Sequence, residues 1–210
     1  MREYLTETIG TFFLVLTVCL SVLGNQPLAP LAIGASLMVM VYMGGHISGG
    51  HYNPAVSLAV ALRGKLPMKQ LLPYWFFQMV GAVLAALVSR VVMNQTMHFF
   101  PSPSATISES LLVEFLFTFA LCLVVLQTAT SAKTQGNSYY GLAIGFTVTF
   151  GAVAGGGISG GAFNPAVALG PILVDATLAR GPFHLAWIYL VGPLLGGVVA
   201  AWAFKSQGNE

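Results

Sequence analysis

The sequence predicts an all-α membrane protein in which six helices cross the bilayer and two short re-entrant half-helices enter it only partway. Charged residues make up 7% of the 210 residues and hydrophobic residues 56%, whereas soluble domains carry about 25% charged residues. Six apolar runs each approach the roughly 20 residues that a helix needs to cross a bilayer. A motif containing Asn-Pro also occurs twice, once in each half of the chain.

We expect the spans at residues 5–24, 30–46, 70–92, 109–130, 139–156 and 184–204. The apolar runs are continuous rather than alternating, which argues against a transmembrane β-barrel. The first run carries Glu7 near its start and is followed by no clear small-residue cleavage site, so we expect it to stay in the protein as a span.

The positions of the cations predict the orientation of these spans. Six spans place most of the lysines and arginines on one side of the membrane: Arg2, Arg63, Lys65, Lys69, Lys133 and Lys205. Only Arg90 and Arg180 fall on the other side. The positive-inside rule then places both termini in the cytoplasm. We expect a multi-pass protein of the plasma (cell inner) membrane.

Several other classes of function have little support. The net charge of +2 and the lack of a basic run argue against a nucleic-acid partner. Cys19 and Cys122 lie in apolar spans, as small buried hydrophobic residues do. His46 and His51 have no third ligand cluster nearby, so we expect no metal and no cofactor, and we interpret His46 as structural.

The two halves of the chain resemble each other. "HISGGHYNPAVSL", from His46, matches "GISGGAFNPAVAL", from Gly157, with the asparagines 111 positions apart (53 to 164). Glu7 aligns with Glu114 at a similar interval. We therefore expect one channel domain over 1–210, with repeats at about 1–100 and 107–210 and a polar connector at 94–107. Because each half has three spans, the second enters the membrane upside down.

Each Asn-Pro pair predicts the start of a helix, with asparagine as the cap and proline at the first position. The run Pro54–Leu62 has nine residues, which give about 13 Å of helix, or half a membrane. The run from Pro165 to Leu173 would meet it from the opposite face. We expect the glycine-rich segments 44–50 and 155–161 to be largely non-helical, so that their carbonyl groups line a path.

Two half-helices that meet at their N-termini concentrate positive potential at mid-membrane. The asparagine amides add hydrogen-bond donors at the same place. Such a site orients small neutral molecules and repels cations and protons. The sequence therefore predicts a passive channel rather than an enzyme.

These features resemble the aquaporin and aquaglyceroporin (major intrinsic protein) family over essentially the whole chain. The resemblance rests on two boxes, Asn53-Pro54-Ala55 and Asn164-Pro165-Ala166, on "HISGGH" and on a glutamate in the first and fourth spans. It implies a six-helix bundle with one pore per subunit and a homotetramer. It also implies that the pore is lined by a set of residues beside the boxes: Gly49, Gly50, His51 and Gly160.

Glu7 and Glu114 need partners, because a carboxylate inside a membrane is costly. The resemblance implies that each accepts hydrogen bonds from the N–H groups of a glycine-rich loop and so acts as a structural buttress. A proton-coupling role is the alternative, and it would suit a secondary transporter, which also uses inverted repeats. Asp175, near the outer end of the second half-helix, is expected to face water.

The resemblance places the four selectivity-filter positions on Ile33, Ala152, Gly161 and Val167. Family members usually have an arginine where this chain has Val167, and water-selective members tend to have an aromatic residue and a histidine at the first two positions. We therefore expect a wide, apolar throat that passes glycerol, urea or neutral metalloid acids such as arsenous and boric acid. The alternative is a strict water channel narrowed by Phe150, Phe163 or an outer-loop side chain.

The quartet "GISG", from Gly157, also matches the G-x-S-G of intramembrane serine proteases, with Ser159 as the nucleophile. The match is short, and "ISGG" recurs at Ile47 in the other half of the chain. A nucleophile has no reason to be duplicated in this way, so the channel is the preferred interpretation.

Overall fold

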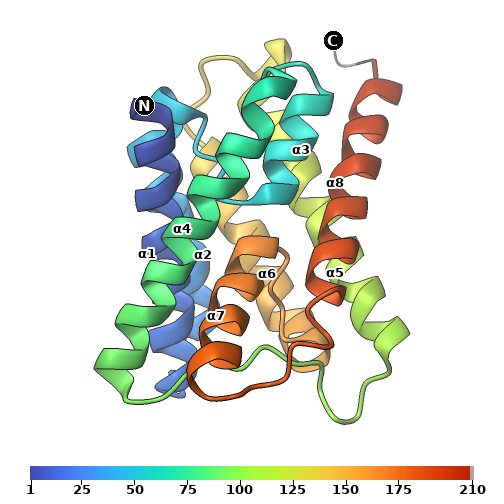
Figure 1. Ribbon diagram of the computed structural model, residues 1–210. Coiled ribbons are helices and arrows are strands. Elements are labelled where there is room, and N and C mark those ends of the chain that lie inside the picture. Colours follow the sequence, from blue (N-terminus) through green and yellow to red (C-terminus); the bar gives the residue numbers. More distant parts are fainter. Residues whose placement is uncertain (209–210) are drawn as a thin grey trace.

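The computed structural model describes residues 1–208 of the 210-residue chain. Within these residues the regular structure is helical and includes no strand (Figure 1). The α-helices are α1 (Arg2–Leu23), α2 (Ala29–Ser48), α3 (Pro54–Leu62), α4 (Met68–Met93), α5 (Ile107–Val125), α6 (Tyr140–Ser159), α7 (Pro165–Leu178) and α8 (Ile188–Ser206). A π-helical turn, Leu126–Thr130, continues α5, and a short 3-10 turn follows at Ala132–Thr134.

In the part of the chain that the structure describes, six helices are long and apolar enough to span a membrane, namely α1, α2, α4, α5 with its π-turn, α6 and α8. The predicted all-α membrane class with six spans is therefore confirmed. The last span begins at Ile188 rather than at residue 184, and α6 continues to Ser159, three residues beyond the predicted end at 156. Both differences lie at helix ends, where composition gives the weakest signal.

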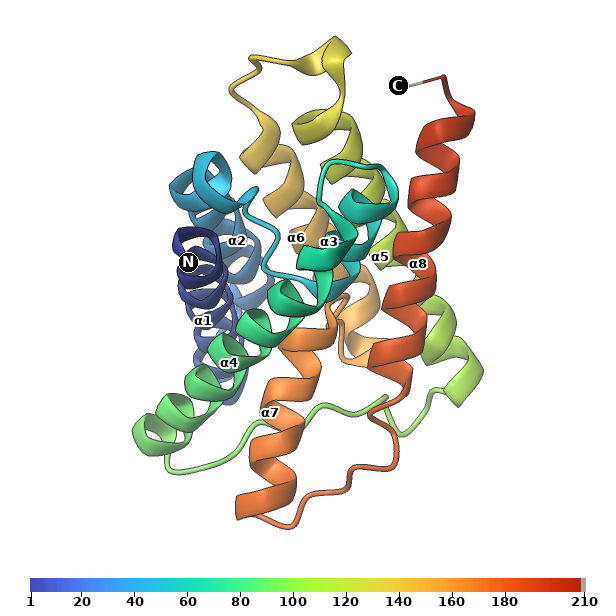
Figure 2. The same ribbon diagram turned by 45° about the horizontal axis from the view of Figure 1, so that its top comes forward.

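The two short helices lie on opposite sides of the bundle. Figures 1 and 2 show both chain ends on the side of α3, while α7 lies toward the opposite side. We call the side with the chain ends the terminal face, and the side crossed by residues 94–106 the connector face. The element order α1–α4 repeats as α5–α8, and α1 packs on α4 as α5 packs on α8. This is the inverted arrangement that the sequence predicts, whereas the repeat boundaries stay a prediction.

Glycines let the helices approach closely at matching places in the two halves. A Cβ atom at Gly81 of α4 would collide with the Thr8 carbonyl oxygen of α1. A Cβ atom at Gly196 of α8 would lie 2.7 Å from the Phe115 carbonyl oxygen of α5. Without a hydrophobic driving force between helices in lipid, such close backbone packing is a main source of helix association.

The prediction that segments 44–50 and 155–161 are largely non-helical is wrong. Helix α2 continues to Ser48 and α6 to Ser159. Only Gly49, Gly50, Gly160 and Gly161 take positive φ angles, of 91°, 63°, 92° and 67°. The helices extend as far as they can because each further turn satisfies backbone groups internally, which a membrane requires.

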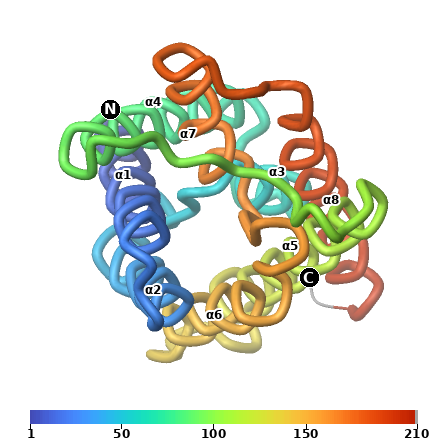
Figure 3. The backbone as a smooth tube through the Cα atoms, turned by 90° about the horizontal axis from the view of Figure 1, so that it is seen from below, coloured from blue at the N-terminus to red at the C-terminus, as the bar shows by residue number. Residues whose placement is uncertain are grey.

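Helix α7 is also longer than predicted, because it ends at Leu178 rather than at Leu173. In contrast, α3 covers Pro54–Leu62, as the sequence predicts. The two half-helices therefore differ in length, and the one on the connector face continues past an internal proline, Pro171. The connector runs across this face from α4 to α5, below the ring of helices (Figure 3).

Candidate functional site

The two asparagines of the boxes join the halves of the protein at their meeting point. Asn53 Oδ1 accepts a hydrogen bond from the Ala55 N–H, and Asn164 Oδ1 accepts one from the Ala166 N–H, each at 2.9 Å. Asn53 Nδ2 donates to the Phe163 carbonyl oxygen at 2.9 Å. These contacts cap each half-helix and tie it to the opposite loop.

The crossed contact is matched from the other side, where Asn164 Nδ2 donates to the Tyr52 carbonyl oxygen at 2.9 Å. Each amide NH₂ group has two hydrogens and uses one of them in this cross-link. The second hydrogen of each amide stays available for a molecule in the adjoining cavity. The N-termini of α3 and α7 add the partial positive charge of their helix dipoles at the same level.

The buried carboxylate of Glu7 holds the loop that precedes α3. Its Oε1 accepts from the Ser48 hydroxyl at 2.6 Å and from the His51 N–H at 3.0 Å. Its Oε2 accepts from the Tyr52 N–H at 2.7 Å. The loop has no backbone partners of its own for these N–H groups, so the carboxylate supplies them.

Glu114 makes the same contacts in the second half. Its Oε1 accepts from the Ser159 hydroxyl at 2.7 Å and from the Ala162 N–H at 3.0 Å, and its Oε2 accepts from the Phe163 N–H at 2.7 Å. The Ser159 hydroxyl also accepts from the Gly161 N–H at 3.1 Å. Ser159, considered above as a nucleophile, is thus fully buried and held within the loop.

Sequence reasoning missed the role of Ser48 and the aromatic supports of these loops. The Tyr74 hydroxyl donates to the Ser48 carbonyl oxygen at 2.8 Å, and the Tyr189 hydroxyl donates to the Ser159 carbonyl oxygen at 2.6 Å. The repeated "ISGG" did mark Ser48 and Ser159 as equivalent. The tyrosines have no such signal, because their position depends on how α4 and α8 pack.

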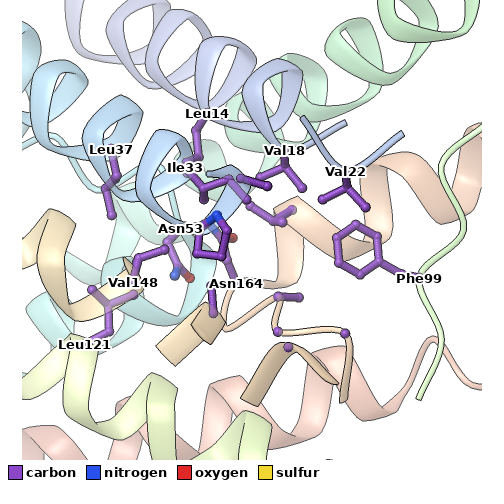
Figure 4. Close-up of a pocket in the computed structure, with 18 of the residues that line it drawn as sticks. Leu14, Val18, Val22, Ile33, Leu37, Asn53, Phe99, Leu121, Val148 and Asn164 are labelled. Atoms are coloured by element: carbon purple, nitrogen blue, oxygen red, sulfur yellow. The ribbon is translucent and has the colours of Figure 1, made fainter. Parts of the chain in front are cut away.

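A cavity of about 320 Å³ opens beside the boxes toward the connector face, and Figure 4 shows part of its lining. We call it the connector-side cavity. All four predicted filter residues line it, namely Ile33, Ala152, Gly161 and Val167. Its remaining lining is largely apolar, and none of the described residues that line it is a lysine, an arginine or an acid.

A second cavity of about 750 Å³ lies toward the terminal face, and we call it the terminal-side cavity. Polar and basic residues line much of it, including Arg63, Lys65 and His46. His46 thus lies at a cavity wall, although the sequence suggested only a structural role. The two cavities therefore differ in character, since the connector-side cavity is largely apolar and the terminal-side cavity is lined by many polar and basic side chains.

Some of the other predicted site residues line a cavity, and the rest support the residues that do. Gly50, His51, Gly160, Asn53 and Asn164 line the connector-side cavity, and His51 also lines the terminal-side cavity together with Gly49. The remaining box residues are buried and are not among the residues that line either cavity: Pro54, Ala55, Pro165 and Ala166. They form the first turns of α3 and α7, which present the asparagines.

Of the side chains proposed to narrow the passage, some lie away from the connector-side cavity and one lines it. Phe150 is 48% exposed on the outside of the bundle, and Phe163 packs against Phe117 at 5.2 Å between ring centroids. Neither is among the residues that line the connector-side cavity. Phe99 of the connector does line it, and its ring lies at the edge of the cavity near Val22 in Figure 4.

Asp175 holds the connector in place, so the expectation that it faces water is wrong. Its side chain is buried, and its Oδ1 accepts from the Thr96 hydroxyl at 2.6 Å. Its Oδ2 lies 2.7 Å from His98 Nδ1. Farther along, the Ser102 N–H donates to the Ile158 carbonyl oxygen at 2.8 Å. The extra length of α7 brings Asp175 under the connector, which its position in the sequence does not reveal.

We expect Glu114→Gln to destabilise the protein. Both carboxylate oxygens accept hydrogen bonds, so an amide must turn its NH₂ group toward a buried donor, and the loss of one such bond costs about 1–3 kcal/mol. The melting temperature of the purified protein in detergent should fall. Glu109→Gln is the matched control, because Glu109 lies on the same helix in an exposed capping box that glutamine also completes. Equal melting temperatures for the two variants would refute the buttress role.

Comparison with known proteins agrees with this geometry. The family model described as "Major intrinsic protein" matches residues 1–204. Aquaporin NIP1-1 of Oryza sativa subsp. japonica is 37% identical over 215 residues, which cover 98% of this chain and 74% of that protein. Aquaporin-8 of Notomys alexis is 39% identical over 211 residues, covering 94% of this chain and 78% of that protein.

A solved structure extends the likeness to the fold. The aquaglyceroporin from Plasmodium falciparum superposes with a TM-score of 0.86 at 22% identity, over 97% of this chain and 95% of that one. The six apolar helices, the paired half-helices and the family match agree with one another. The chain therefore belongs to the major intrinsic protein (aquaporin) family, and it is a multi-pass membrane channel rather than an enzyme.

Proposed function

We propose that this channel passes water together with small uncharged solutes, with glycerol, urea and neutral metalloid acids such as arsenous and boric acid as the candidates. One observation carries the proposal. The four filter residues Ile33, Ala152, Gly161 and Val167 share one cavity and offer it no side-chain hydrogen-bond donor. The throat therefore selects by size and by cost of dehydration rather than by fixed charge.

Dehydration explains why ions are excluded from such a throat. An ion that leaves water for an apolar passage loses several kcal/mol of hydration that nothing in the lining replaces. A neutral hydroxylated molecule loses far less. At the end of the passage it meets the free amide hydrogens of Asn53 and Asn164, which restore a hydrogen bond.

The half-helices add an electrostatic barrier at the same level. The N-termini of α3 and α7 face each other across the boxes, so their partial positive charges add. Cations and protons are repelled, while a dipolar molecule turns its oxygen toward the asparagines. This chain has Val167 where family members usually have an arginine. The helix dipoles therefore contribute a larger share of the charge selectivity here than they would in a relative that has the arginine.

The names of similar proteins fit this range of solutes. The relatives described above are called aquaporins, and the similar solved structure is called an aquaglyceroporin. A secondary transporter is less well supported. Glu7 and Glu114, the carboxylates that such a mechanism would use, are each occupied by three hydrogen bonds from their loops.

A strict water channel is the second candidate, and the position of Phe99 favours it. Its side chain is only 3% exposed, lines the connector-side cavity and packs edge-on against Tyr189 at 5.9 Å between centroids. The contacts of Asp175 with Thr96 and His98 hold this part of the connector in place. A rigid aromatic ring at the edge of the connector-side cavity would narrow it, and so replace some of the side-chain volume that the small filter residues lack.

We also propose that both termini are cytoplasmic in the plasma (cell inner) membrane and that the protein forms a homotetramer. Both chain ends lie on the terminal face (Figure 1), and the basic residues Arg63 and Lys65 line the cavity on that side. The positive-inside rule assigns such a face to the cytoplasm.

The proposed homotetramer can be tested by native mass spectrometry of the protein released from detergent. The spectrum should show four copies of the chain, and a persistent monomer would contradict the assembly.

Val167→Arg should reduce glycerol and arsenous acid flux by roughly tenfold or more, which corresponds to about 1.4 kcal/mol of added barrier. Arginine brings bulk, a fixed charge and five donors to the cavity. Water flux should fall less, because water is smaller. Stopped-flow measurements on proteoliposomes provide the test, with Val167→Ala as the size control. Wild-type vesicles that pass water but no glycerol, urea or metalloid acid would overturn the wide-throat proposal.

Phe99→Leu separates the two candidate functions. In a wide-throat channel the substitution should leave glycerol flux little changed, since the solute already passes. In a strict water channel glycerol flux should appear only in the variant. Phe150→Leu is the matched control, because Phe150 lies on the outside of the bundle and is 48% exposed. Both variants are measured in the same stopped-flow assay.

The orientation is tested with single introduced cysteines. The native Cys19 and Cys122 are fully buried, so they should not react with a membrane-impermeant maleimide. Ser104→Cys, on the exposed connector, should react on intact cells, whereas Ser206→Cys, exposed near the C-terminus, should react only after the cells are opened. The reverse pattern would invert the topology.

A further inference from the structure

The two cavities share part of their lining. His51 and Val125 line both the connector-side and the terminal-side cavity. A molecule that moves from one cavity to the other therefore passes these two side chains. Val125 offers only hydrocarbon, so the imidazole of His51 decides whether the passing molecule finds a hydrogen-bond donor or an acceptor there.

The surroundings of His51 are not repeated in the other half. His51 Nδ1 lies 3.1 Å from the Ser57 hydroxyl oxygen. At the 111-residue interval of the boxes, the counterparts of His51 and Ser57 are Ala162 (51 + 111) and Ala168 (57 + 111). The second half builds the same loop without this pair, so the pair is not needed to shape the loop.

Gln78 of α4 is the third member of this group, and it too has no counterpart. Its Nε2 donates to Glu7 Oε2 at 2.8 Å and to the Ser57 hydroxyl oxygen at 2.9 Å. The matching helix contacts of Gly81 and Gly196 are 115 residues apart (81 to 196), which places Pro193 opposite Gln78 (78 + 115). Within residues 1–208, Glu114 accordingly accepts hydrogen bonds from Ser159, Ala162 and Phe163 but from no side-chain amide.

The directions of these hydrogen bonds follow from what each group can donate. The carboxylate of Glu7 only accepts, so the atom of Gln78 that faces it is the NH₂ nitrogen. That nitrogen gives its other hydrogen to Ser57. Ser57 accepts there, and its hydroxyl oxygen also lies 3.1 Å from His51 Nδ1. We assign Nδ1 as the acceptor, because a hydroxyl that accepted from both neighbours would leave its own buried hydrogen without a partner. In a neutral ring the proton then lies on Nε2.

We propose that the chain Glu7–Gln78–Ser57 fixes His51 as its neutral Nε2–H tautomer, so that the channel presents a hydrogen-bond donor at the junction of the two cavities. Gln78 and Ser57 are positioning residues, because they act through His51. The junction is a second selectivity point, separate from the filter residues. It favours molecules with an acceptor oxygen, because Val125, the other side chain that lines both cavities, offers no hydrogen bond.

The packing around the junction supports a fixed ring. His51 is 7% exposed, Gln78 and Ser57 are fully buried, and the Tyr74 ring lies 5.2 Å from the imidazole between centroids. Backbone contacts hold the residue too, since the His51 N–H donates to Glu7 Oε1. A buried ring with its Nδ1 occupied keeps one orientation, and the tautomer then decides what it offers to the passage.

Nitrogen-15 NMR of the full-length protein in lipid nanodiscs, labelled at histidine, tests the tautomer directly. We expect the His51 signals, assigned by their loss in His51→Gln, to show a protonated Nε2 and a bare Nδ1. Ser57→Ala removes the donor to Nδ1 and should produce a mixture of tautomers. Ser89→Ala is the matched control, because Ser89 is also a buried serine of the described residues and no hydrogen bond joins it to His51, Ser57 or Gln78 there. A protonated Nδ1 in the wild type overturns the proposal.

Flux measurements test the consequence for selectivity, and this arm rests on the proposed function. Urea accepts through its carbonyl oxygen, whereas water can turn to donate instead. Ser57→Ala should therefore lower urea flux relative to water by roughly two- to tenfold, the range spanned by one net hydrogen bond. A shifted tautomer with an unchanged flux ratio overturns the selectivity point. If the wild type passes no urea, the wide-throat function fails, while the NMR arm still decides the tautomer.

Discussion

The structure depends on two buried carboxylates that satisfy backbone N–H groups at the middle of the membrane. The loops before α3 and α7 leave the helical hydrogen-bond pattern where no water is available to replace it. Glu7 and Glu114 each supply acceptors to two successive N–H groups and a serine hydroxyl. These hydrogen bonds satisfy the N–H groups of both loops directly before the half-helices begin.

Between the two fixed loops, each box asparagine donates a hydrogen bond to a backbone carbonyl group in the opposite half of the protein. This crossed arrangement makes the two halves depend on each other, since each box caps its own helix and also binds the opposite loop. Tyr52 and Phe163, the residues before the boxes, take positive φ angles of 48° and 49°, which places their carbonyl oxygens within reach. Such backbone strain persists because several contacts define the position of each loop at once.

The loops and half-helices are alike in the two halves, but the cavities on the two sides of the boxes differ. One side is an apolar cavity with the four predicted filter residues, and the other is a larger cavity with basic and hydroxyl side chains. The polar group of His51, Ser57 and Gln78 occurs only in the first half, whereas the Asp175 contact with the connector occurs only in the second. The two halves share the contacts of their loops and half-helices, whereas these groups, which place His51 and His98 at the cavity walls, differ between them.

The sequence by itself determined the six spans, the paired half-helices and the residues at their N-termini, because length, apolar content and Asn-Pro caps act locally along the chain. It also identified Glu7 and Glu114, since a carboxylate in an apolar run needs a partner. Only the tertiary structure decided where Asp175, Phe99 and Gln78 act. Their partners are 79 residues away for Asp175 and 71 for Gln78, and such contacts depend on how helices pack. The glycine-rich segments likewise became helical because burial in a membrane outweighs the weak helix propensity of glycine.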